Sequence, residues 1–284
     1  MKIAKTIKSV RGLVGTARKA GKRIGFVPTM GALHEGHISL IDRSLKDGNF
    51  TVVSIFVNPT QFGPREDLSK YPRPIRADLK ICKEQGVDVV FAPTAQEMYG
   101  RGTVTWVEVE KLNGPLCGRT RPGHFRGVAT VCAKLFNIVC PDFAYFGQKD
   151  AQQAAIIKRM VADLNIPVKI EVCPTIRADD GLALSSRNQY LSPQQRRDAT
   201  CIYRSLEAGR EMIKAGDTNP KTITAMMRKI LRAAETLTDI DYISIVNADT
   251  LEDISRVDGK ALIAVAARFG HTRLIDNLTV DTNK

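Results

Sequence analysis

Long hydrophobic runs and paired cysteines are scarce in this sequence of 284 residues. The longest apolar runs, at 52–57 and 261–267, are too short to cross a bilayer, and the basic N-terminus lacks the apolar core and cleavage signal of a secretory leader. The six cysteines (82, 117, 132, 140, 173 and 201) form no C-x-x-C pair, which favours reduced thiols and shows no zinc cluster. We therefore expect a cytoplasmic protein that does not enter a membrane.

Aromatic residues make up only 6% of the chain, although its formal net charge is +12. That charge is compatible with a nucleic-acid-binding module, because Lys and Arg neutralise phosphates. The basic residues are nevertheless spread along the chain, and few aromatic residues alternate with them. We favour a basic surface around an anionic small-molecule site and expect no nucleic-acid partner; steep salt-dependent binding to duplex DNA or RNA would support the alternative.

Five short, nearly continuously apolar segments in the first part of the chain are typical of strands buried on both faces of a parallel sheet. They lie at 24–28, 51–57, 87–92, 143–147 and 167–172. Helical patterns lie between them, with apolar residues on one face: Ile38, Ile41 and Leu45; Ile75, Leu79 and Cys82; and Ile157, Met160, Val161 and Leu164. The alternation predicts an α/β, doubly wound, Rossmann-like N-terminal domain, with an insertion near 100–125.

The pattern changes near residue 178. Two helices are expected first, one with Ala199, Ile202, Leu206 and Ile213 on its apolar face and the other with Ile223, Met226, Met227 and Ile230. Three strand-like segments follow: DYISIVN, ALIAVAARF and TRLIDNL. Helices followed by strands predict a smaller α+β C-terminal domain, so we expect domains at 1–177 and 178–284.

A histidine-containing turn, PTMGALHEGH at 28–37, follows the first predicted strand. His34 and His37 lie three residues apart, and glycines at 31 and 36 allow backbone to approach a ligand closely. Ligands of open parallel sheets bind outside the carboxyl ends of the strands, and the N-terminus of the helix expected from Gly36 attracts anions. The pattern indicates that two imidazoles lie where phosphate charge is held.

Other interpretations of this turn are weaker. The zincin motif spaces its histidines four apart, so the three-residue spacing here disfavours zinc. A structural role would be the better explanation for one histidine alone, but not for two beside glycines at the end of a strand. The Walker and G-x-G-x-x-G patterns are both absent. If a nucleotide binds, the histidines and a later basic motif hold its phosphates.

Two further motifs follow predicted strands. In FVNPTQFG, Asn58 and Gln61 are uncharged donors and acceptors suited to orienting hydroxyl and carboxylate groups. Turn chemistry is the alternative explanation of Asn58, whereas Gln61 has less turn rationale. In FGQKDAQQ, Gly147 allows a sharp turn and Asp150 alone would be an ordinary helix cap. A cap does not explain Lys149, because cations are disfavoured at a helix N-terminus. A bound polyanion would explain the position of Lys149.

A third motif, DGLALSSRNQYLS, lies at the expected domain junction. Ser185, Ser186 and Arg187 form a hydroxyl and guanidinium cluster suited to phosphates. Serine-rich loops before helices are also common, and Ser192 before Pro193 is a helix cap.

Together these stretches resemble the pantothenate synthetases, the pantoate–β-alanine ligase family, within the nucleotidyltransferase superfamily whose H-x-G-H signature the histidine turn matches. The resemblance runs from PTMGALHEGH through FVNPTQFG, RPGHFRGV, YFGQKDAQQ and LALSSRN to GHTRLIDN, nearly the whole chain. It implies ATP-dependent condensation of D-pantoate with β-alanine to pantothenate, AMP and pyrophosphate through a pantoyl-adenylate, with Mg²⁺. A related adenylyl- or cytidylyltransferase that releases a nucleotide conjugate is the alternative, and detection of an amide product would decide.

Residue roles follow from the resemblance, position by position. It implies that His34, His37 and Lys149 are catalytic, with His37 as proton donor. Gln61 would contact pantoate and then β-alanine, and Gln153 would hold pantoate's other side. The positions that it assigns to ATP are Met30, Gly31, Ala32, Leu33, His34, Glu35, Gly36, His37, Gly147, Gln148, Lys149, Asp150, Ile176, Leu184, Ser185, Ser186 and Arg187.

The resemblance also implies a homodimer and a smaller domain, 178–284, that closes over the ATP site beside a nucleotide- and pantoate-binding domain, 1–177. It assigns no ligand to the metal ion. Ala151 departs from the aromatic residue expected at its position. Arg121 and His124 match the family without a defined role.

Overall fold

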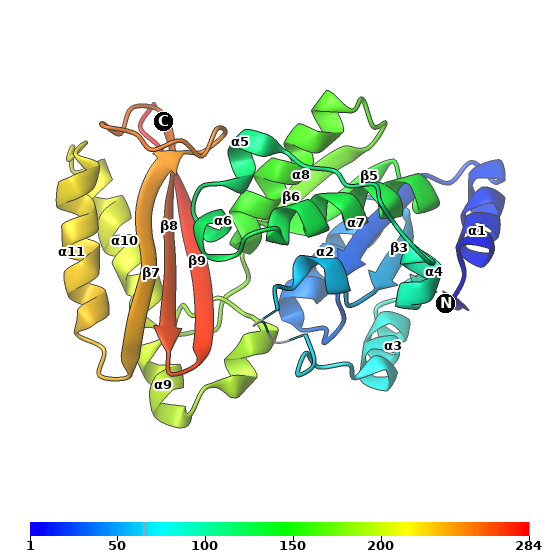
Figure 1. The fold of residues 1–284 in the computed structure, drawn as a ribbon, viewed down its shortest axis with the longest axis horizontal. Coiled ribbons are helices and arrows are strands. Elements are labelled where there is room, and N and C mark those ends of the chain that lie inside the picture. The colour runs from blue at the N-terminus through cyan, green and yellow to red at the C-terminus, as the bar shows by residue number, and fades with distance from the viewer. Residues whose placement is uncertain (65, 67, 284) are drawn as a thin grey trace. The chain divides into compact units, whose positions relative to one another are not determined.

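The computed structural model describes residues 1–64, 66 and 68–283. They form two compact units (Figure 1). The first unit comprises residues 1–113, 121–147 and 156–174, and the second comprises 114–120, 148–155 and 175–284. These units exchange short segments, whereas the predicted domains 1–177 and 178–284 are continuous; that functional division stays a prediction.

A six-stranded parallel sheet forms the centre of the first unit (Figure 1). Its order is β1 (Lys2–Ala4), β4 (Val89–Phe91), β3 (Phe50–Ile55), β2 (Ile24–Thr29), β5 (Phe143–Gly147) and β6 (Lys169–Cys173). Every neighbouring pair is parallel. The five predicted strands are confirmed, and β1 is an additional edge strand of only three residues, too short to give a sequence pattern.

Helices of the first unit follow from this strand order. They are α1 (Ile7–Lys19), α2 (Glu35–Lys46), α3 (Ile75–Glu84), α4 (Ala95–Tyr99), α5 (Glu110–Asn113) and α7 (His124–Val139), with the short 3₁₀ turn η1 (Pro59–Gln61). Right-handed crossovers place α1 and α7 on one face and α2 and α3 on the other, because their connections run in opposite directions along the sheet. The core beneath α2 joins Val27, Val53 and Tyr145 of three strands to Ile41.

The direction of the connections reverses between β2 and β5, which is where open α/β sheets bind ligands. Thr29 ends β2 level with Ile55 of β3, and Gly147 ends β5 level with Cys173 of β6. The β2–β5 register pairs Phe26 with Ala144. The predicted binding segments at 30–37, 58–61, 148–153 and 176 therefore all begin shortly after strands that end at this edge.

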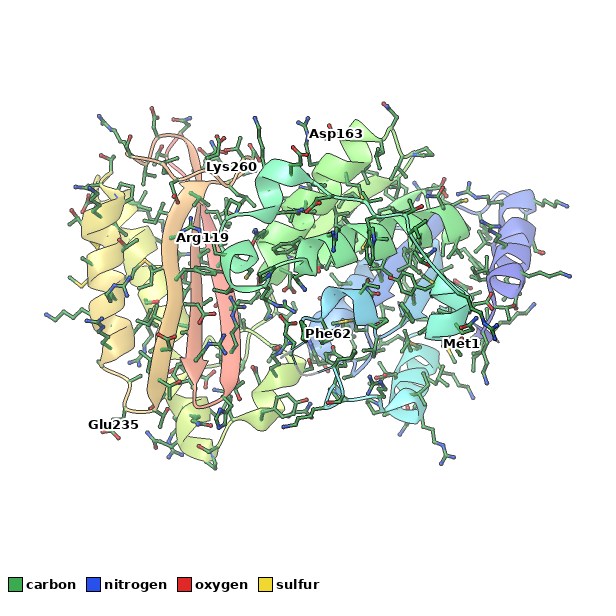
Figure 2. All side chains as sticks on the ribbon, viewed as in Figure 1. Met1, Phe62, Arg119, Asp163, Glu235 and Lys260 are labelled. Carbon is green, nitrogen blue, oxygen red and sulfur yellow. The ribbon has the colours of Figure 1, made fainter. Side chains whose placement is uncertain are left out.

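The second unit contains a three-stranded antiparallel sheet, in the order β7 (Leu237–Asn247), β8 (Lys260–Phe269) and β9 (Thr272–Asp281). Lys260 at the start of β8 is labelled in Figure 2. The helices α10 (Cys201–Lys214) and α11 (Pro220–Arg232) pack on one face of this sheet (Figure 1). The remaining short elements are α6 (Cys117–Thr120), η2 (Gln148–Asp150), η3 (Ser186–Tyr190) and α9 (Pro193–Asp198), while α8 (Ala151–Asp163) is shared by both units.

Helix ends follow local sequence. Ser192 caps α9 as predicted: its Oγ accepts from the Gln195 N–H, and the Ser192 N–H donates in turn to Gln195 Oε1. Helices α10 and α11 approach closely at Gly209, where a built Cβ would lie 3.0 Å from Met227 Sδ. Met227 is fully buried, but Met226, predicted on the same apolar face, is 43% exposed; Leu231 takes its place in the core.

No helix among residues 1–64, 66 and 68–283 is long and apolar enough to span a membrane. All six cysteines are free thiols, and only Cys140 is exposed.

The two neighbouring methionines allow a matched test of this packing. Met227→Ala should lower the free energy of unfolding by about 2–5 kcal/mol, because a buried side chain is lost and a cavity remains between α10 and α11. Met226→Ala removes the same atoms from an exposed position and should change it little. Urea denaturation of both variants measures the difference; equal losses would contradict the assignment of the buried face.

Candidate active site

A buried carboxylate fixes the backbone of the histidine turn. Asp78 of α3 is 1% exposed and accepts hydrogen bonds from the N–H groups of Ala32 (3.0 Å) and Leu33 (2.8 Å). Gly31 and Ala32 have φ values of 83° and 51°, in the left-handed region that only glycine adopts without cost. The two hydrogen bonds to Asp78 stabilise this backbone, and a Cβ on Gly31 would lie 2.9 Å from the Asp78 carboxylate.

The two predicted catalytic histidines pair at the start of α2. His34 is the N-cap residue, and its Nδ1 accepts from the Gly36 N–H at 3.1 Å. His37 Nδ1 accepts from the His34 N–H at 3.3 Å, and the ring centroids lie 4.2 Å apart. Because a backbone N–H can only donate, both Nδ1 atoms are acceptors, and each neutral ring carries its hydrogen on Nε2.

Several N–H groups of the turn have partners within the protein. The sequence predicts that N–H groups at the helix N-terminus attract the anion, but those of Gly36 and His37 donate to the side chain and the carbonyl of His34. The N–H groups of Ala32 and Leu33 donate to Asp78. The two imidazole Nε2–H groups, on half-buried side chains, are further donors of this turn.

Asn58, at the N-cap of η1, has a fixed amide orientation. The Thr60 N–H is a donor and lies 3.4 Å from Asn58 Oδ1, and the Tyr99 hydroxyl lies 2.6 Å from the same oxygen. On its other side Asn58 Nδ2 lies 3.2 Å from the Gly127 carbonyl, which can only accept. These backbone groups assign Oδ1 and Nδ2 without ambiguity.

Gln61 takes its orientation from Asn58. Asn58 Nδ2 donates to Gln61 Oε1 at 3.0 Å, so the Nε2 end of Gln61 is the end that points elsewhere, 3.0 Å from Met30 Sδ. The structure thus brings Gln61 next to Met30 of the histidine turn. A thioether is a weak acceptor, so the buried Gln61 offers an N–H₂ group suited to a carboxylate or hydroxyl oxygen.

Arg121 and His124 also contact this segment. Arg121 pairs with Glu66 through two hydrogen bonds of 2.8 and 2.6 Å, and its Nη1 lies 2.9 Å from His124 Nε2. A guanidinium only donates, so His124 accepts at Nε2 and donates from Nδ1 to the Gln61 carbonyl at 2.8 Å. Burial opposes ionisation of Glu66, but Arg121 outweighs it and lowers the Glu66 pKa.

Close helix packing completes the support of η1. A Cβ built on Gly127 of α7 would lie 2.3 Å from the Thr60 carbonyl oxygen, so only glycine lets α7 approach η1 this closely. Phe62, labelled in Figure 2, follows η1 and packs edge-on against the Tyr71 ring, with centroids 5.8 Å apart.

In the second unit, η2 contains the predicted ATP residues Gln148, Lys149 and Asp150, and Gln153 lies in the first turns of α8. The carbonyl groups of Gln148 and Lys149 accept hydrogen bonds from Asn277 Nδ2 at 3.0 and 2.9 Å. The backbone that supports Lys149 is thus tied to strand β9.

The remaining predicted ATP residues lie on a hairpin of the second unit. The Leu184 N–H donates to the Ile176 carbonyl at 3.0 Å, which brings together two positions eight residues apart in the chain. Ser185 caps η3, and its Oγ accepts from the Arg187 N–H at 3.3 Å. Ser186 and Arg187 follow in η3, and both are half-buried.

Comparisons with known proteins agree with this arrangement. The family model for pantoate–β-alanine ligase matches residues 2–279. The pantothenate synthetase of Acetivibrio thermocellus is 52% identical over 281 residues, which are 99% of this chain and 100% of that protein. The chain belongs to the pantoate–β-alanine ligase family.

Solved structures of the family have the same fold. The pantothenate synthetase of Thermus thermophilus superposes with a TM-score of 0.93 at 45% identity, covering 98% of this chain and 99% of that chain. The pantoate–β-alanine ligase of Francisella tularensis, solved with β-γ ATP and β-alanine, gives 0.79 at 36% identity, covering 98% and 97%. The predicted family, α/β fold and ligase activity are confirmed.

The individual roles of the site residues stay predictions. The first unit contains Met30 to His37, Gln61 and Gly147, and the second contains Gln148 to Asp150, Gln153, Ile176 and Leu184 to Arg187. Within their own units, the structure joins Gln61 to Met30, His34 to His37 and Ile176 to Leu184.

Sequence reasoning missed the residues that support the candidate site. Asp78 gave only the ordinary signal of an acid in the first turn of a helix, and Asn277 lay within the GHTRLIDN stretch without a role. Turn chemistry, one of the two interpretations of Asn58, accounts for its cap on Thr60 but not for its contact with Gln61.

The oriented amide of Gln61 gives a direct prediction. Asn58→Asp keeps the acceptor for Thr60 but puts a carboxylate oxygen against Gln61 Oε1 and the Gly127 carbonyl, so the Gln61 amide should turn over. Pantoate would then lose the N–H₂ donor that binds its charged carboxylate. The KM for pantoate should therefore rise by roughly 10- to 100-fold, and the KM for ATP should stay unchanged.

Asn137→Asp on α7 is the matched control, because Asn137 is exposed and donates only to the Ala133 carbonyl among the bonds described. Steady-state kinetics of both variants, with thermal unfolding to monitor folding, test the prediction. A parallel rise in both Michaelis constants would count against the orientation of Gln61.

Proposed function

We propose that this ligase joins D-pantoate to β-alanine in two steps, the first forming pantoyl-adenylate from ATP. The observation that carries the proposal is the pair of imidazoles at the carboxyl end of β2. Each accepts a backbone N–H at Nδ1 and so directs its donor capacity through Nε2. Fixed donors of this kind stabilise negative charge that develops during transfer at a phosphate.

In the first step a carboxylate oxygen of pantoate attacks the α-phosphorus of ATP. The bond between that phosphorus and the bridging oxygen breaks, and pyrophosphate leaves with its electron pair. Activation is needed because an amine does not displace oxide from a carboxylate. In the second step the β-alanine amine attacks the acyl carbon, loses a proton and displaces AMP.

The site residues divide between these steps. His34, His37 and Lys149 stabilise the charge that passes to pyrophosphate, and His37 is the proposed proton donor. Gln61 donates from Nε2 to pantoate and later contacts β-alanine, whereas Gln153 holds the other side of pantoate. Support for Gln61 comes from its fixed amide, whose Oε1 is already occupied by Asn58.

The nucleotide is proposed to lie against the remaining residues of the resemblance. These are Met30, Gly31, Ala32, Leu33, Glu35, Gly36, Gly147, Gln148, Asp150, Ile176, Leu184, Ser185, Ser186 and Arg187. The Francisella tularensis ligase was solved with β-γ ATP and β-alanine, which supports both as ligands here.

Magnesium fits the chain as an ion carried by ATP. Among residues 1–64, 66 and 68–283 no group of three or more His, Cys, Asp or Glu side chains could hold a metal. Mg²⁺ needs only one or two carboxylates when substrate phosphates and water complete its shell, and Asp150 is the carboxylate that the η2 segment offers. When bound, the ion neutralises phosphate charge.

Assembly and location are further proposals. Family resemblance supports a homodimer, and six free thiols are consistent with a reducing cytoplasm. It also supports closure of a domain at 178–284 over ATP bound to 1–177. The partners are small molecules, with no nucleic acid or membrane.

The order of steps can be tested by isotope exchange. Labelled pyrophosphate should enter ATP when pantoate is present and β-alanine is absent, since the first step is reversible on its own. Lys149→Ala should reduce this exchange by about 10²–10³-fold, the usual cost of one lost stabilising donor.

Lys158→Ala is a control with the same substitution on an exposed part of α8. It should exchange at the wild-type rate. Exchange that requires β-alanine would refute the proposed order, and full exchange by Lys149→Ala would remove the lysine from the first step.

A further inference from the structure

Strand β9 carries two buried polar residues, Asp276 and Asn277, that the ligase mechanism does not use. Both are 4% exposed and belong to the GHTRLIDN stretch. Neighbouring residues of a strand point to opposite faces of the sheet, so the two side chains project in opposite directions. Each of them contacts a different predicted ATP segment of the second unit.

Asn277 clamps η2. Its Nδ2 donates to the carbonyls of Gln148 and Lys149, and its Oδ1 accepts from Gln148 Nε2 at 3.1 Å. Both donor hydrogens and the acceptor of the amide are therefore used on one short segment. The 3₁₀ turn that supports Lys149 cannot shift without breaking these three hydrogen bonds.

Asp276 holds the hairpin that contains Ile176 and Leu184. Its carboxylate accepts from both Nη atoms of Arg177, one at 3.0 Å, in a bidentate pair whose side chains are 16% and 3% exposed. Arg177 Nη1 also donates to the Gly181 carbonyl at 3.1 Å, and its guanidinium stacks 4.1 Å from the Tyr203 ring. The hairpin turn packs closely against the Tyr203 ring, because a Cβ on Gly181 would lie 2.1 Å from that ring.

The two contacts are joined through the backbone of β9. The Asn277 N–H donates to Asp276 Oδ1 at 2.8 Å, and the Asn277 carbonyl lies 3.5 Å from Arg177 Nη2. Burial raises the pKa of Asp276 above its ordinary value, while the nearby charges of Arg177 and Lys149 lower it. The carboxylate thus lies within the electrostatic reach of the lysine as well as bonding the arginine.

We propose that Asp276 and Asn277 are positioning residues that fix Lys149 and the 176–187 hairpin in the spacing needed to hold the phosphates of ATP. Neither residue touches the reacting atoms. The proposal rests on the proposed function, because that function assigns ATP to both segments. A strand is well suited to the task, since its hydrogen bonds to β8 hold adjacent residues in fixed register.

The test replaces the donors of Asn277 without changing its shape. Asn277→Asp keeps the acceptor for Gln148 Nε2 but turns a carboxylate oxygen toward two carbonyls, and should displace η2. The KM for ATP in pantoate-dependent pyrophosphate exchange should rise by roughly 10- to 100-fold, because η2 loses its hydrogen bonds to Asn277, while the KM for pantoate stays unchanged. Asn277→Ala removes the donors without adding charge and should show the same selectivity.

Asn247→Ala is the matched control. Asn247, in the same unit, caps a turn by accepting from the N–H groups of Asp249 and Thr250, each at 2.9 Å, so its loss lowers stability without reaching η2. It should leave the KM for ATP unchanged even where its melting temperature falls. Asn277 variants that lose stability with both Michaelis constants unchanged, or raised equally, would overturn the positioning role.

Binding of ATP alone separates this proposal from the proposed function. If the wild-type protein shows no pantoate-dependent exchange, the proposed function fails. Calorimetric titration with ATP still tests whether Asn277 positions η2. Weaker ATP binding by Asn277→Asp than by Asn247→Ala supports it, and equal binding contradicts it.

Discussion

The conformation of the histidine turn depends on one buried carboxylate. Asp78 accepts the N–H groups of Ala32 and Leu33 and so holds a backbone that turns through left-handed conformations at positions 31 and 32. Buried backbone donors must find partners, and a loop that bends this sharply has no strand to supply them. Because the turn is fixed, α2 begins at Glu35, and the imidazoles of His34 and His37 cap it through Nδ1. Thr29 Oγ1 adds a third anchor by accepting from the Gly31 N–H, and the direction of both Nε2–H groups follows from the turn held in this way.

The same principle recurs around the other predicted binding residues. Gln61 receives its amide orientation from Asn58, whose own orientation is set by the Thr60 N–H and the Gly127 carbonyl. The backbone of Lys149 is held by Asn277. In each case a side chain with a proposed role at the substrate is positioned by another that accepts or donates to an obligatory backbone group. The geometry of the candidate site therefore depends on the fixed polarity of the peptide unit.

The sequence predicted the elements whose signals are periodic. The five apolar segments became β2 to β6 because strands buried on both faces need continuous apolar residues. The histidine turn and the segment at 58–61 follow the carboxyl ends of β2 and β3, as predicted. Strand β1 has only three residues, and Met226 fits the helical period yet lies on the exposed side of α11. In the site, the histidine turn was recognisable from composition and position.

The long-range polar contacts could not be predicted from the sequence. Asp78 lies 46 positions from Ala32, and Asn277 lies 128 positions from Lys149. No local pattern marks such pairs, since an acid near a helix start or an asparagine in a strand has several ordinary explanations. The roles of Arg121 and His124 were open for the same reason, and their contacts with Glu66 and the Gln61 carbonyl appear only once η1 and α7 are packed together.

In the proposed first step, a pantoate carboxylate oxygen becomes bonded to the α-phosphorus of ATP. Turnover of pantoate labelled with ¹⁸O in its carboxylate, followed by mass spectrometry of the products, tests this step most directly. We expect one labelled oxygen in AMP and none in pyrophosphate. Label in pyrophosphate, or AMP without label, would show that activation takes place at a different phosphorus or without an adenylate.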